Sequence, residues 1–581
     1  MASLEEKRHT LAHLLAAAVT DRYPHAKATI GPTIDNGFYY DFDFSGGTKP
    51  GEEELALLEE DMRALLPSWT DMRGTETSEQ DAQDRFKANP FKLELIQDIV
   101  SKGEKVTLYT AGDFTDLCRG GHAENPAKEI RADSFKLDRV AGAYWRGDEK
   151  NQMLTRIYGL AYDTKDELDA YLAQREEAKK RDHRKIAKEQ GLLVFSDLVG
   201  SGMPMFTPKG NIIREAIINY SRELNTELGF GEVHTPNVNK GELFKISGHY
   251  DKYKEDMLTV HSQYVEDEMF LKPMNCPQHT QIYAAEPKSY RDLPVRFSDF
   301  AVLYRDERPG ELSGLTRLRS FSQDDGHIFC REDQIESELT AVLSAIQKAL
   351  ATYRIGYWVR LSLRDPEKKE KYIGEDAVWE KSEAIMRNLL TEKAMNFKEA
   401  LGEAAFYGPK MDIMAVDAIG REWQISTIQL DLNMPGRFGL EYTAEDGTKK
   451  TPVMIHRALT GSPDRFMGVL IEHYAGAFPT WLSPVQVKIL PVSEKHNAYA
   501  HEVADALTSV GLRADIDDTN ESLGKKIRAS KMEKIPYVLV VGDAEIAAKT
   551  VSVESRDAGK LDAMTVTDFV ARVTEEARTR A

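Results

Sequence analysis

The segment Leu-Tyr-Arg-Asp-Glu (303–307), followed by Arg-Leu-Arg-Ser-Phe-Ser-Gln-Asp-Asp-Gly-His (317–327), gathers cations, carboxylates, an aromatic ring and an imidazole in one short stretch. Alternate side chains of a paired strand face the same side, so we expect Arg305 and Glu307 to share a face. Such a surface suits a nucleotide bound beside a polar small molecule. A salt-bridged hairpin that faces water is the alternative.

The bulk composition is that of a multidomain globular protein. The chain has 581 residues, which predicts about four domains at roughly 150 residues each. Its three cysteines, Cys118, Cys276 and Cys330, argue against a disulfide framework and for a reducing compartment. The N-terminal stretch lacks a hydrophobic signal core, and no apolar run approaches the roughly 18 residues of a membrane span. We therefore expect a cytoplasmic protein without a membrane partner.

A cationic block stands out in an acidic chain. The formal net charge of −19 argues against a general polyanion binder, but local fields decide which surface meets a nucleic acid. Residues 179–188 read Lys-Lys-Arg-Asp-His-Arg-Lys-Ile-Ala-Lys. This block is either a nucleic-acid contact or the solvated face of a helix.

The N-terminal part predicts a mixed domain and a connector. Residues 1–163 combine an expected helix at 4–23 with a strand-like run at 37–43, which favours an α+β domain. The capping-box pattern Thr-Lys-Asp-Glu (164–167) begins a mostly charged helix expected to run to residue 190. A long polar helix between domains is typical of a connector.

The rest of the chain predicts two further domains. From 191 to 484 helices and strands alternate irregularly, with strand-like runs at 295–297, 301–304 and 357–363. This favours an antiparallel-rich sheet with flanking helices over regular βαβ units. Residues 485–581 alternate more regularly, which predicts a small α/β domain with a largely parallel sheet. The expected fold class is a multidomain α+β protein.

Two arginines are candidates for phosphate binding. The sequence has no glycine-rich phosphate loop, so arginines would have to hold a bound nucleotide. A guanidinium such as that of Arg305 grips phosphate bidentately and stays charged. Ser462 suits a helix N-cap and Pro463 the first helical position, which would place Arg465 in a first turn where the helix dipole favours anions. The two arginines would straddle a polyphosphate.

Cys276, His327 and His456 are candidate metal ligands. One thiolate and two imidazoles suit zinc, and three protein ligands leave a coordination position open for substrate. These residues lie far apart in the sequence, without a local Cys-x2-Cys pattern. Their spacing alone is therefore weak evidence for a metal.

A second group of donors lies in the N-terminal part. His9 and His13 would lie on one face of a helix, one turn apart, and Cys118 and His122 form a similar short pair. Four such groups would form either a metal site or a hydrolytic pocket. Isolated histidines with a structural role are the alternative.

The ordered motifs identify a family. From about residue 5 to its C-terminus the chain resembles the bacterial-type threonyl-tRNA synthetases, which are class II aminoacyl-tRNA synthetases. The motifs that carry this resemblance are Ser-Gly-His-Tyr (247–250), Lys-Pro-Met-Asn-Cys-Pro (272–277), Ser-Tyr-Arg-Asp-Leu-Pro (289–294), Gln-Asp-Asp-Gly-His-Ile-Phe (323–329), Phe-Tyr-Gly-Pro-Lys (406–410) and Phe-Pro-Thr-Trp-Leu (478–482).

The resemblance implies a reaction and a set of residues for it. Threonine would attack ATP, assisted by Mg2+, to give threonyl-adenylate and pyrophosphate, and the threonyl group would pass to tRNA(Thr). Arg305 would hold the α-phosphate and the attacking carboxylate, Arg465 the γ-phosphate, and Phe321 the adenine by stacking. Catalysis of this kind depends on positioning and charge neutralisation. The other implied catalytic, ATP-binding or threonine-binding residues are Gln323, Lys410, Glu307, Arg317, Asp325, Tyr407, Gln424, Gln429, Ser462 and Met274.

The resemblance also implies class motif 1 at 230–236, in the interface of a homodimer, and one Zn2+ per subunit on Cys276, His327 and His456. Threonine offers zinc an amine and a hydroxyl, whereas valine lacks the hydroxyl. A binding site whose polar groups are left unpaired discriminates against such an analogue by a factor of roughly 10^4 to 10^5 in kcat/KM. Asp325 would accept the hydroxyl hydrogen.

Serine keeps the hydroxyl and lacks only one methyl group, which changes the binding free energy by about 1–3 kcal/mol. Binding alone would therefore not exclude serine, and a second, hydrolytic selection step is needed. Residues 1–163 resemble the editing domain of the family, which hydrolyses mischarged seryl-tRNA(Thr). The residues that match its pocket are His9, His13, Cys118, His122 and Asp116. We favour water activation without a metal there, but the sequence leaves a metal open.

The last hundred residues resemble the anticodon-binding domain of several class II synthetases, with Asn520 and Glu545 matching positions that read anticodon bases. Glu554 stands where arginine is expected, and Asp306 where asparagine is expected. The small ubiquitin-like N-terminal domain of the family is not seen ahead of the editing histidines. We expect these three departures to affect contacts with tRNA or ATP.

Three other functions remain to be separated from threonine activation with editing. A catalytically silent paralogue would bind RNA as a regulator, but it would not be expected to retain Arg305, Arg465 and all three candidate ligands. A synthetase for serine or proline is disfavoured, because chelation requires both a hydroxyl and a primary amine. A free editing hydrolase explains only residues 1–163.

Overall fold

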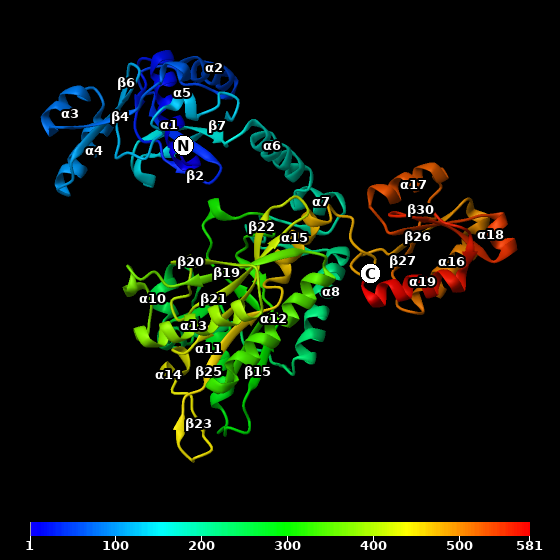
Figure 1. Cartoon of the computed structure of the whole chain (residues 1–581). Helices are drawn as coiled ribbons and strands as arrows, with labels where there is room; N and C mark the ends of the chain where they lie inside the picture. Colours follow the sequence, from blue (N-terminus) through cyan, green and yellow to red (C-terminus); the bar gives the residue numbers. More distant parts are fainter. Residues whose placement is uncertain (1) are drawn as a thin grey trace. The chain divides into compact units, whose positions relative to one another are not determined.

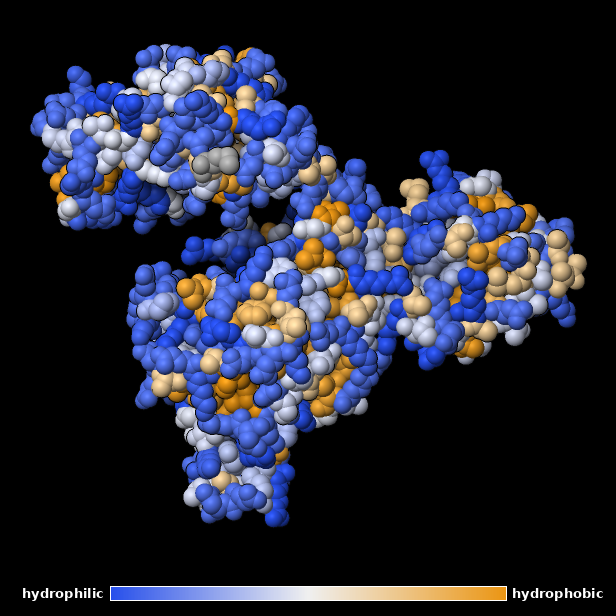
Figure 2. Space-filling view, viewed as in Figure 1, coloured by the Kyte–Doolittle hydropathy of each residue, from blue (hydrophilic) through white to orange (hydrophobic). Residues whose placement is uncertain are grey.

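The computed structural model describes residues 2–581 and divides into two compact units, Met1–Glu176 and Glu177–Ala581 (Figure 1). The second unit contains a large core followed by the smaller core of the C-terminal segment. This confirms the predicted multidomain α+β class. Among residues 2–581 no helix has the length and apolar composition needed to cross a membrane. On the face shown in Figure 2, hydrophobic residues form separate patches between hydrophilic ones.

Helix α1 (Leu4–Arg22) packs on the main sheet of the first unit and confirms the helix predicted at 4–23. A capping box starts it, because Ser3 Oγ accepts from the Glu6 N–H and the Glu6 carboxylate accepts from the Ser3 N–H. Every residue from Thr10 to Val19 is buried, so this helix runs through the core. The antiparallel sheet has the order β1-β3-β8-β7, with β2 paired to β3. Its strands are β1 (Lys27–Ala28), β2 (Thr33–Ile34), β3 (Gly37–Asp43), β7 (Phe135–Tyr144) and β8 (Met153–Ala161).

A second sheet of the first unit has the strand order β4-β5-β6, and its last strand leads into the predicted site residue Cys118. Strand β6 (Phe114–Leu117) contains Asp116 and ends directly before Cys118. Gly120 and Gly121 follow with φ of 109° and 81°, a conformation that favours glycine and lets the chain turn back. The turn brings His122 back to Cys118. The other elements of this part are α2 (Leu55–Leu65), β4 (Arg73–Thr77), α3 (Glu79–Arg85), α4 (Pro90–Ser101), β5 (Val106–Ala111) and α5 (Pro126–Glu129).

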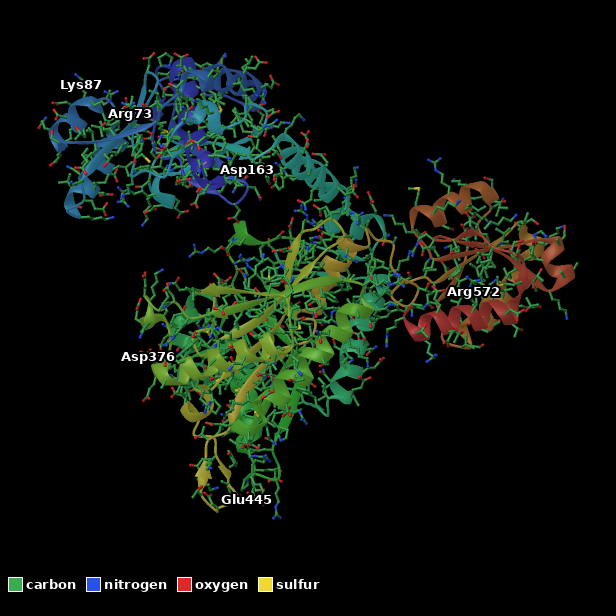
Figure 3. The ribbon with its side chains drawn as sticks, viewed as in Figure 1. Arg73, Lys87, Asp163, Asp376, Glu445 and Arg572 are labelled. Atoms are coloured by element: carbon green, nitrogen blue, oxygen red, sulfur yellow. The ribbon has the colours of Figure 1, made fainter. Side chains whose placement is uncertain are left out.

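The predicted connector is two helices rather than one. Asp163, labelled in Figure 3, accepts a hydrogen bond from Lys7 Nζ at 2.6 Å just before the connector begins. Thr164 and Glu167 form the predicted capping box at the start of α6 (Lys165–Lys180). The helix is interrupted after Lys180, and Asp182 caps a new helix, α7 (His183–Glu189), by accepting from the Arg184 N–H at 2.8 Å.

The second unit is organised on an eight-stranded sheet with the order β11-β15-β18-β25-β22-β21-β19-β20. Only the pairs at its two ends, β11 with β15 and β19 with β20, are parallel. This confirms the predicted antiparallel-rich sheet. The strands are β11 (Gly231–Glu232), β15 (Val295–Asp299), β18 (Asp325–Cys330), β19 (Gly356–Leu363), β20 (Phe397–Leu401), β21 (Lys410–Val416), β22 (Glu422–Asp431) and β25 (Val453–Ala458).

Helices and short strands surround this sheet, and α12 packs against β19, β22 and β25 (Figure 1). The helices are α8 (Pro208–Glu227), α9 (Gly241–Ser247), α10 (His249–Tyr253), α11 (Cys276–Ala284), α12 (Ile335–Thr352), α13 (Asp376–Glu392), α14 (Met434–Arg437) and α15 (Pro463–His473). The short strands are β9 (Leu193–Val194), β10 (Met205–Phe206), β12 (Val238–Lys240), β13 (Thr259–Val260), β14 (Met269–Leu271), β16 (Val302–Tyr304), β17 (Ser320–Ser322), β23 (Tyr442–Thr443) and β24 (Lys449–Lys450).

Strand register places a row of functional groups across the sheet. His327 of β18 lies opposite His456 of β25, and His456 lies opposite Gln429 of β22. Gln429 in turn lies opposite Lys410 of β21. Directly opposed residues have Cβ atoms roughly 4.5–5.5 Å apart and face the same side. Residues distant in sequence are therefore brought into one line.

The hairpin β16–β17 is shorter than the sequence suggests. Leu303 pairs with Phe321, but β16 ends at Tyr304. Arg305 and Glu307 follow the strand, so strand alternation does not place them, but both side chains line the same two cavities. The Glu307 N–H instead donates to the Arg305 carbonyl at 2.9 Å, which closes a turn.

The C-terminal part has a mixed sheet with the order β27-β26-β28-β29-β30, and β31 pairs with β29. Strand β26 is parallel to β27 and β28, as predicted, but β29 is antiparallel to β28, so the sheet is less parallel than expected. Its elements are β26 (Val487–Pro491), α16 (Asn497–Thr508), β27 (Ala514–Ile516), α17 (Leu523–Met532), β28 (Tyr537–Val541), α18 (Asp543–Ala548), β29 (Thr550–Ser555), β30 (Gly559–Lys560), β31 (Met564–Thr565) and α19 (Val566–Thr579).

Candidate active sites

The first site is a cavity of about 640 Å³ on the eight-stranded sheet, adjoined by a second of about 480 Å³. Together they bring every candidate residue of the second unit's active site into one region. The first is lined by Met274, Cys276, Arg305, Glu307, Arg317, Gln323, Asp325, His327, Tyr407, Lys410, Gln429 and His456. The second shares five of these residues and adds Phe321, Gln424, Ser462 and Arg465.

Arg305 is a half-buried cation that lines both cavities. Its guanidinium carbon lies 5.1 Å from the centroid of the Phe321 ring. Desolvation lowers the pKa of Arg305, and Glu307 offsets part of that shift. Within residues 2–581 no carboxylate forms an ion pair with it, whereas Glu307 pairs with Arg317 at 2.8 Å. A partly desolvated cation without an ion-pair partner favours an anionic ligand.

Arg465 lies in the first turn of α15, as the sequence predicts. Ser462 is the N-cap and accepts from the Arg465 N–H at 3.2 Å, and Pro463 is the first helical residue. Burial lowers the pKa of Arg465, and the neighbouring charges of Arg305 and Arg317 lower it further. An anion bound between these cations would relieve their repulsion, so the arrangement suits a polyphosphate.

Cys276, His327 and His456 meet at one wall of the first cavity, with one ligand atom from each within 4.8 Å of the others. All three side chains are buried. His327 Nε2 and His456 Nδ1 are 3.1 Å apart, and the other ring nitrogen of His456 lies 3.1 Å from Asp431 Oδ2. A carboxylate behind an imidazole is the arrangement that fixes a metal-binding histidine. This donor set therefore fits a metal ion.

Burial raises the pKa of the Cys276 thiol well above its ordinary value. A bound cation would reverse that effect by stabilising the thiolate, which is the form that binds metal. On the other side, His327 Nδ1 lies 2.7 Å from His279 Nδ1. The trio is therefore supported by buried groups that orient its rings.

Sequence reasoning missed several residues of this site. Asp431 and His279 contact the metal-donor trio, Asn275 Nδ2 donates to Asp325 Oδ2 at 2.9 Å, and Thr427 lines both cavities. Thr427 and Asp431 stand on β22, outside the motifs, so no local pattern links them to this site. His279 follows Cys276 on α11 and Asn275 directly precedes it, but the sequence does not indicate what either side chain contacts.

The second site lies in the first unit and brings together the predicted donors His9, His13, Cys118 and His122. Cys118 Sγ is 3.4 Å from His9 Nε2 and 3.2 Å from His122 Nε2. His13 Nδ1 is 3.0 Å from Asp116 Oδ2, so the fifth predicted residue of this pocket is also present.

Two buried residues that the sequence did not indicate complete this site. Lys92 Nζ lies 2.6 Å from Asp116 Oδ1 and donates to the Tyr40 hydroxyl at 3.1 Å. The Tyr40 hydroxyl in turn donates to Asp116 Oδ2 at 2.5 Å. Lys92 stands in an ordinary amphipathic helix and Tyr40 in an aromatic strand, so their role depends on the fold alone.

The electrostatics of this pocket favour a thiolate. Burial alone would raise the pKa of Cys118, but hydrogen bonds with His122, His13 and His9 outweigh it and lower that pKa to about 3. Burial would lower the pKa of His13, but Asp116 and Cys118 raise it to about 9. Burial would raise the pKa of Asp116, but Lys92 and His13 lower it. The pocket therefore holds fixed charges at neutral pH.

These shifts predict selective alkylation of Cys118 by iodoacetamide. The thiolate is the reactive form, and its pKa of about 3 lies below the tested range, so the rate should stay nearly flat from pH 5 to 8. An ordinary thiol would gain about tenfold per pH unit there. The label is located by peptide mass spectrometry, with Cys118→Ser as the control. Cys276 and Cys330 are buried, and burial raises the pKa of Cys330 to about 12, so neither should react. A rate that climbs steeply with pH would contradict the assignment.

The predicted anticodon residues are not joined into one cluster by a contact. Asn520 is exposed in the loop before α17. Glu545 lies in the first turn of α18, where its carboxylate accepts from the Gly542 N–H at 2.9 Å and from Ser552 Oγ at 2.7 Å. Glu554, the departure noted above, pairs with Lys531 Nζ at 2.6 Å. The second departure, Asp306, is exposed, with its N–H donating to the Asp256 carbonyl.

Comparisons with known proteins agree with this organisation. A family model described as the threonyl and alanyl tRNA synthetase second additional domain matches residues 106–158. A tRNA synthetase class II core domain model matches 258–474, and an anticodon binding domain model matches 486–576.

Relatives match along nearly the whole chain. A threonine--tRNA ligase of Rubrobacter xylanophilus is 47% identical over 576 residues, which cover 99% of this chain and 89% of the relative. That of Gloeobacter violaceus is 46% identical, over 96% of this chain and 90% of the relative. A crystal structure titled as the RNA binding domain of the threonyl-tRNA synthetase of Cryptosporidium parvum matches with a TM-score of 0.65 and 36% identity, covering 68% of this chain and 98% of that one. The chain therefore belongs to the threonine–tRNA ligase family of class II aminoacyl-tRNA synthetases.

Proposed function

We propose that the chain activates threonine with ATP and transfers it to tRNA(Thr). The observation that carries the proposal is that the metal donors Cys276, His327 and His456 share the first cavity with Arg305, while Arg465 lines the adjoining cavity. Among residues 2–581 neither of these arginines has an ion-pair partner. Threonine-dependent exchange of pyrophosphate into ATP tests it, and exchange driven equally by valine would contradict it.

The residues supply position and charge for this reaction. A carboxylate oxygen of threonine attacks the α-phosphorus of ATP, the bond to the bridging oxygen of the β-phosphate breaks, and pyrophosphate leaves with the bonding electrons. Arg305 holds the attacking carboxylate and the α-phosphate, and Arg465 neutralises the γ-phosphate end of the leaving group. Phe321 stacks on adenine beside Glu307 and Arg317. Mg2+ is expected to accompany ATP. A hydroxyl of the tRNA terminal adenosine then attacks the adenylate carbonyl and releases AMP.

We propose zinc as the metal, held by Cys276, His327 and His456 with one ion per subunit. When bound, it supplies positions for the amine and the hydroxyl of threonine. Asn275 holds one oxygen of Asp325, which leaves the other free to accept the hydroxyl hydrogen. Valine has the amine but no hydroxyl, so it leaves one metal position and Asp325 without a partner. This selection also separates the chain from the proline synthetases, whose substrate lacks a hydroxyl and a primary amine.

The other implied residues are proposed to contact the substrates. Gln323 and Lys410 line the first cavity, where they meet the reacting groups. The remaining proposed contacts are Met274, Tyr407, Gln424, Gln429 and Ser462. Tyr407 donates a hydrogen bond to Gln429 Oε1, which fixes both side chains at the threonine end.

A second activity, hydrolysis of seryl-tRNA(Thr), is proposed for the first unit. The match to the second additional domain and the five gathered residues of its pocket support it. His9 is half-buried, with its Nε2 3.4 Å from Cys118 Sγ and its Nδ1 3.2 Å from the Gly121 carbonyl oxygen. We propose that His9 moves a proton for an attacking water, without a metal.

His9→Ala is expected to leave threonine charging within about twofold and to slow clearance of seryl-tRNA(Thr) by on the order of 10²-fold, the usual contribution of a positioned proton-transfer group. Deacylation of preformed seryl-tRNA(Thr) measures it. His25→Ala is the matched control, because His25 is an exposed histidine of the same unit whose Nε2 lies 2.8 Å from the Thr48 carbonyl. Clearance at the wild-type rate would remove His9 from the mechanism.

The remaining assignments complete the proposal. We propose domains at 1–163, 191–484 and 485–581 joined by a helical connector, and a homodimer through the segment 230–236, which sedimentation measurements test.

Asn520 and Glu545 are proposed to contact anticodon bases, although Glu545 would have to exchange its capping bonds for them. Binding of tRNA with an altered anticodon tests this. A cytoplasmic location is proposed for the enzyme, which fractionation checks.

A further inference from the structure

A buried carboxylate next to the first cavity accepts hydrogen bonds from several side chains on both of its oxygens. Asp412 lies in β21 with a relative exposure of 0%. Its Oδ2 accepts from Arg360 Nη2 at 3.1 Å, Ser362 Oγ at 2.8 Å and Lys410 Nζ at 2.8 Å. Arg360 and Ser362 stand on β19, and Lys410 stands two residues away on β21. Asp412 therefore joins side chains of β19 and β21 next to the first cavity.

The other oxygen organises the neighbouring strand β22. Asp412 Oδ1 accepts from Gln424 Nε2 at 2.8 Å and from Thr427 Oγ1 at 3.0 Å. Gln424 Oε1 accepts from Arg360 Nη2 at 2.8 Å, which fixes the orientation of the amide. Its N–H groups are used by Asp412 and by Thr427, whose Oγ1 lies 3.3 Å away.

This arrangement determines what the three cavity-lining members offer a ligand. Lys410 lines the first cavity, Gln424 the second and Thr427 both. Lys410 donates one of its three N–H groups to Asp412, so its other N–H groups remain available to an anion. Gln424 Oε1 and Thr427 Oγ1 keep only acceptor capacity, because their donors are already committed. A nucleoside triphosphate matches this pattern, with anionic oxygens at one end and hydroxyl or amine donors at the other.

We propose that Asp412 is a positioning residue that sets the hydrogen-bonding pattern of the nucleotide pocket through Lys410, Gln424 and Thr427. The inference rests on the proposed threonine–tRNA ligase activity and deepens it. Asp412 lines neither cavity, so its effect is transmitted by the side chains that it holds. A carboxylate in this role accepts on both oxygens, which a carboxamide cannot do.

The test is Asp412→Asn in the full-length protein, assayed by threonine-dependent pyrophosphate exchange. The amide nitrogen would face either the cationic donors or the Gln424–Thr427 pair, so one set must reorient. We expect KM for ATP to rise at least about tenfold, because two or more hydrogen bonds of the pocket are lost. KM for threonine should stay within about twofold, and the metal content should be unchanged.

Asp417→Asn is the matched control, because Asp417 is also a buried carboxylate of this sheet region. It accepts from the Ile419 and Arg421 N–H groups, from Arg421 Nε and from Trp423 Nε1, and it lines neither cavity. This variant should lose thermal stability and keep its KM for ATP. A merely structural role for Asp412 would give both variants the same kinetics.

A second variant keeps the proposal testable if Asp412→Asn fails to fold. Arg360→Met removes the partner shared by Asp412 and Gln424 but leaves the carboxylate in place, so KM for ATP should rise about threefold to tenfold. An unchanged KM for ATP in a folded Asp412→Asn protein, or in Arg360→Met if the first is unfolded, would overturn the inference. Absence of exchange in the wild-type protein would instead reject the proposed function itself.

Discussion

Replacing Arg305 by glutamine is expected to lower the rate of threonine-dependent pyrophosphate exchange by on the order of 10³-fold, equivalent to about 4 kcal/mol of transition-state stabilisation. Arg305 is half-buried, lines both cavities and has no ion-pair partner within residues 2–581. Its charge is therefore held ready for the carboxylate and phosphate oxygens that share negative charge as the new bond forms. Glutamine can donate hydrogen bonds there but cannot supply the charge.

The size of this effect distinguishes catalysis from folding. Arg387→Gln is a matched control, because Arg387 forms an exposed ion pair with Glu399 at 2.6 Å and lines neither cavity. Loss of an exposed pair costs at most about 1 kcal/mol of stability and should leave exchange unchanged. If Arg305→Gln kept a tenth or more of the wild-type rate, another residue would have to neutralise the reacting phosphate.

Much of this site could be predicted because residue chemistry and short local rules were sufficient. Ser462, Pro463 and Arg465 follow the preferences of a helix N-terminus, and the structure has them there. Cys276, His327 and His456 suit zinc by their chemistry, but their spacing is weak evidence, and the family resemblance was needed to select them. Their meeting depends on strand register, however, which face alternation alone does not specify across distant strands.

Local sequence patterns predicted the wrong element ends where a turn or a side-chain cap interrupts a strand or a helix. Arg305 and Glu307 were expected on a strand, but β16 ends at Tyr304. One further backbone bond follows, from the Arg305 N–H to the Arg319 carbonyl at 2.9 Å, and the chain then turns toward Pro309 and Gly310. The charged connector was expected as one helix, but Asp182 caps a second one. Helical periodicity does not reveal such a cap inside a charged run.

Buried polar partners were the least predictable part. Asp412 stands between apolar residues of β21, which signals that a buried charge needs partners. The identity of those partners comes from β19 and β22 and is a property of the topology. In the first unit, Lys92 and Tyr40 reach Asp116 from separate elements for the same reason.

Removing the proposed zinc ion is expected to abolish threonine activation. Metal analysis of the purified protein should find one zinc per chain, and dialysis against a chelator should reduce threonine-dependent exchange by on the order of 10⁴-fold. That figure corresponds to the roughly 10^4 to 10^5 by which a buried polar site rejects a substrate that leaves its groups unpaired. Cys276→Ala should do the same, because two imidazoles do not complete the donor set. Addition of zinc should restore the chelated protein but not the variant.

The serine and valine reactions decide whether the ion selects the substrate or only supports the fold. A selecting metal predicts that the intact protein activates serine measurably and valine hardly at all, since serine has both the amine and the hydroxyl. A supporting metal predicts that its removal lowers the melting temperature and weakens activation of all three amino acids by one common factor. Cys330→Ala is the control for loss of a buried thiol, because Cys330 lies in the main core away from the trio. Valine activation comparable to that of threonine in the zinc-loaded protein would contradict selection by chelation, whatever the melting temperature.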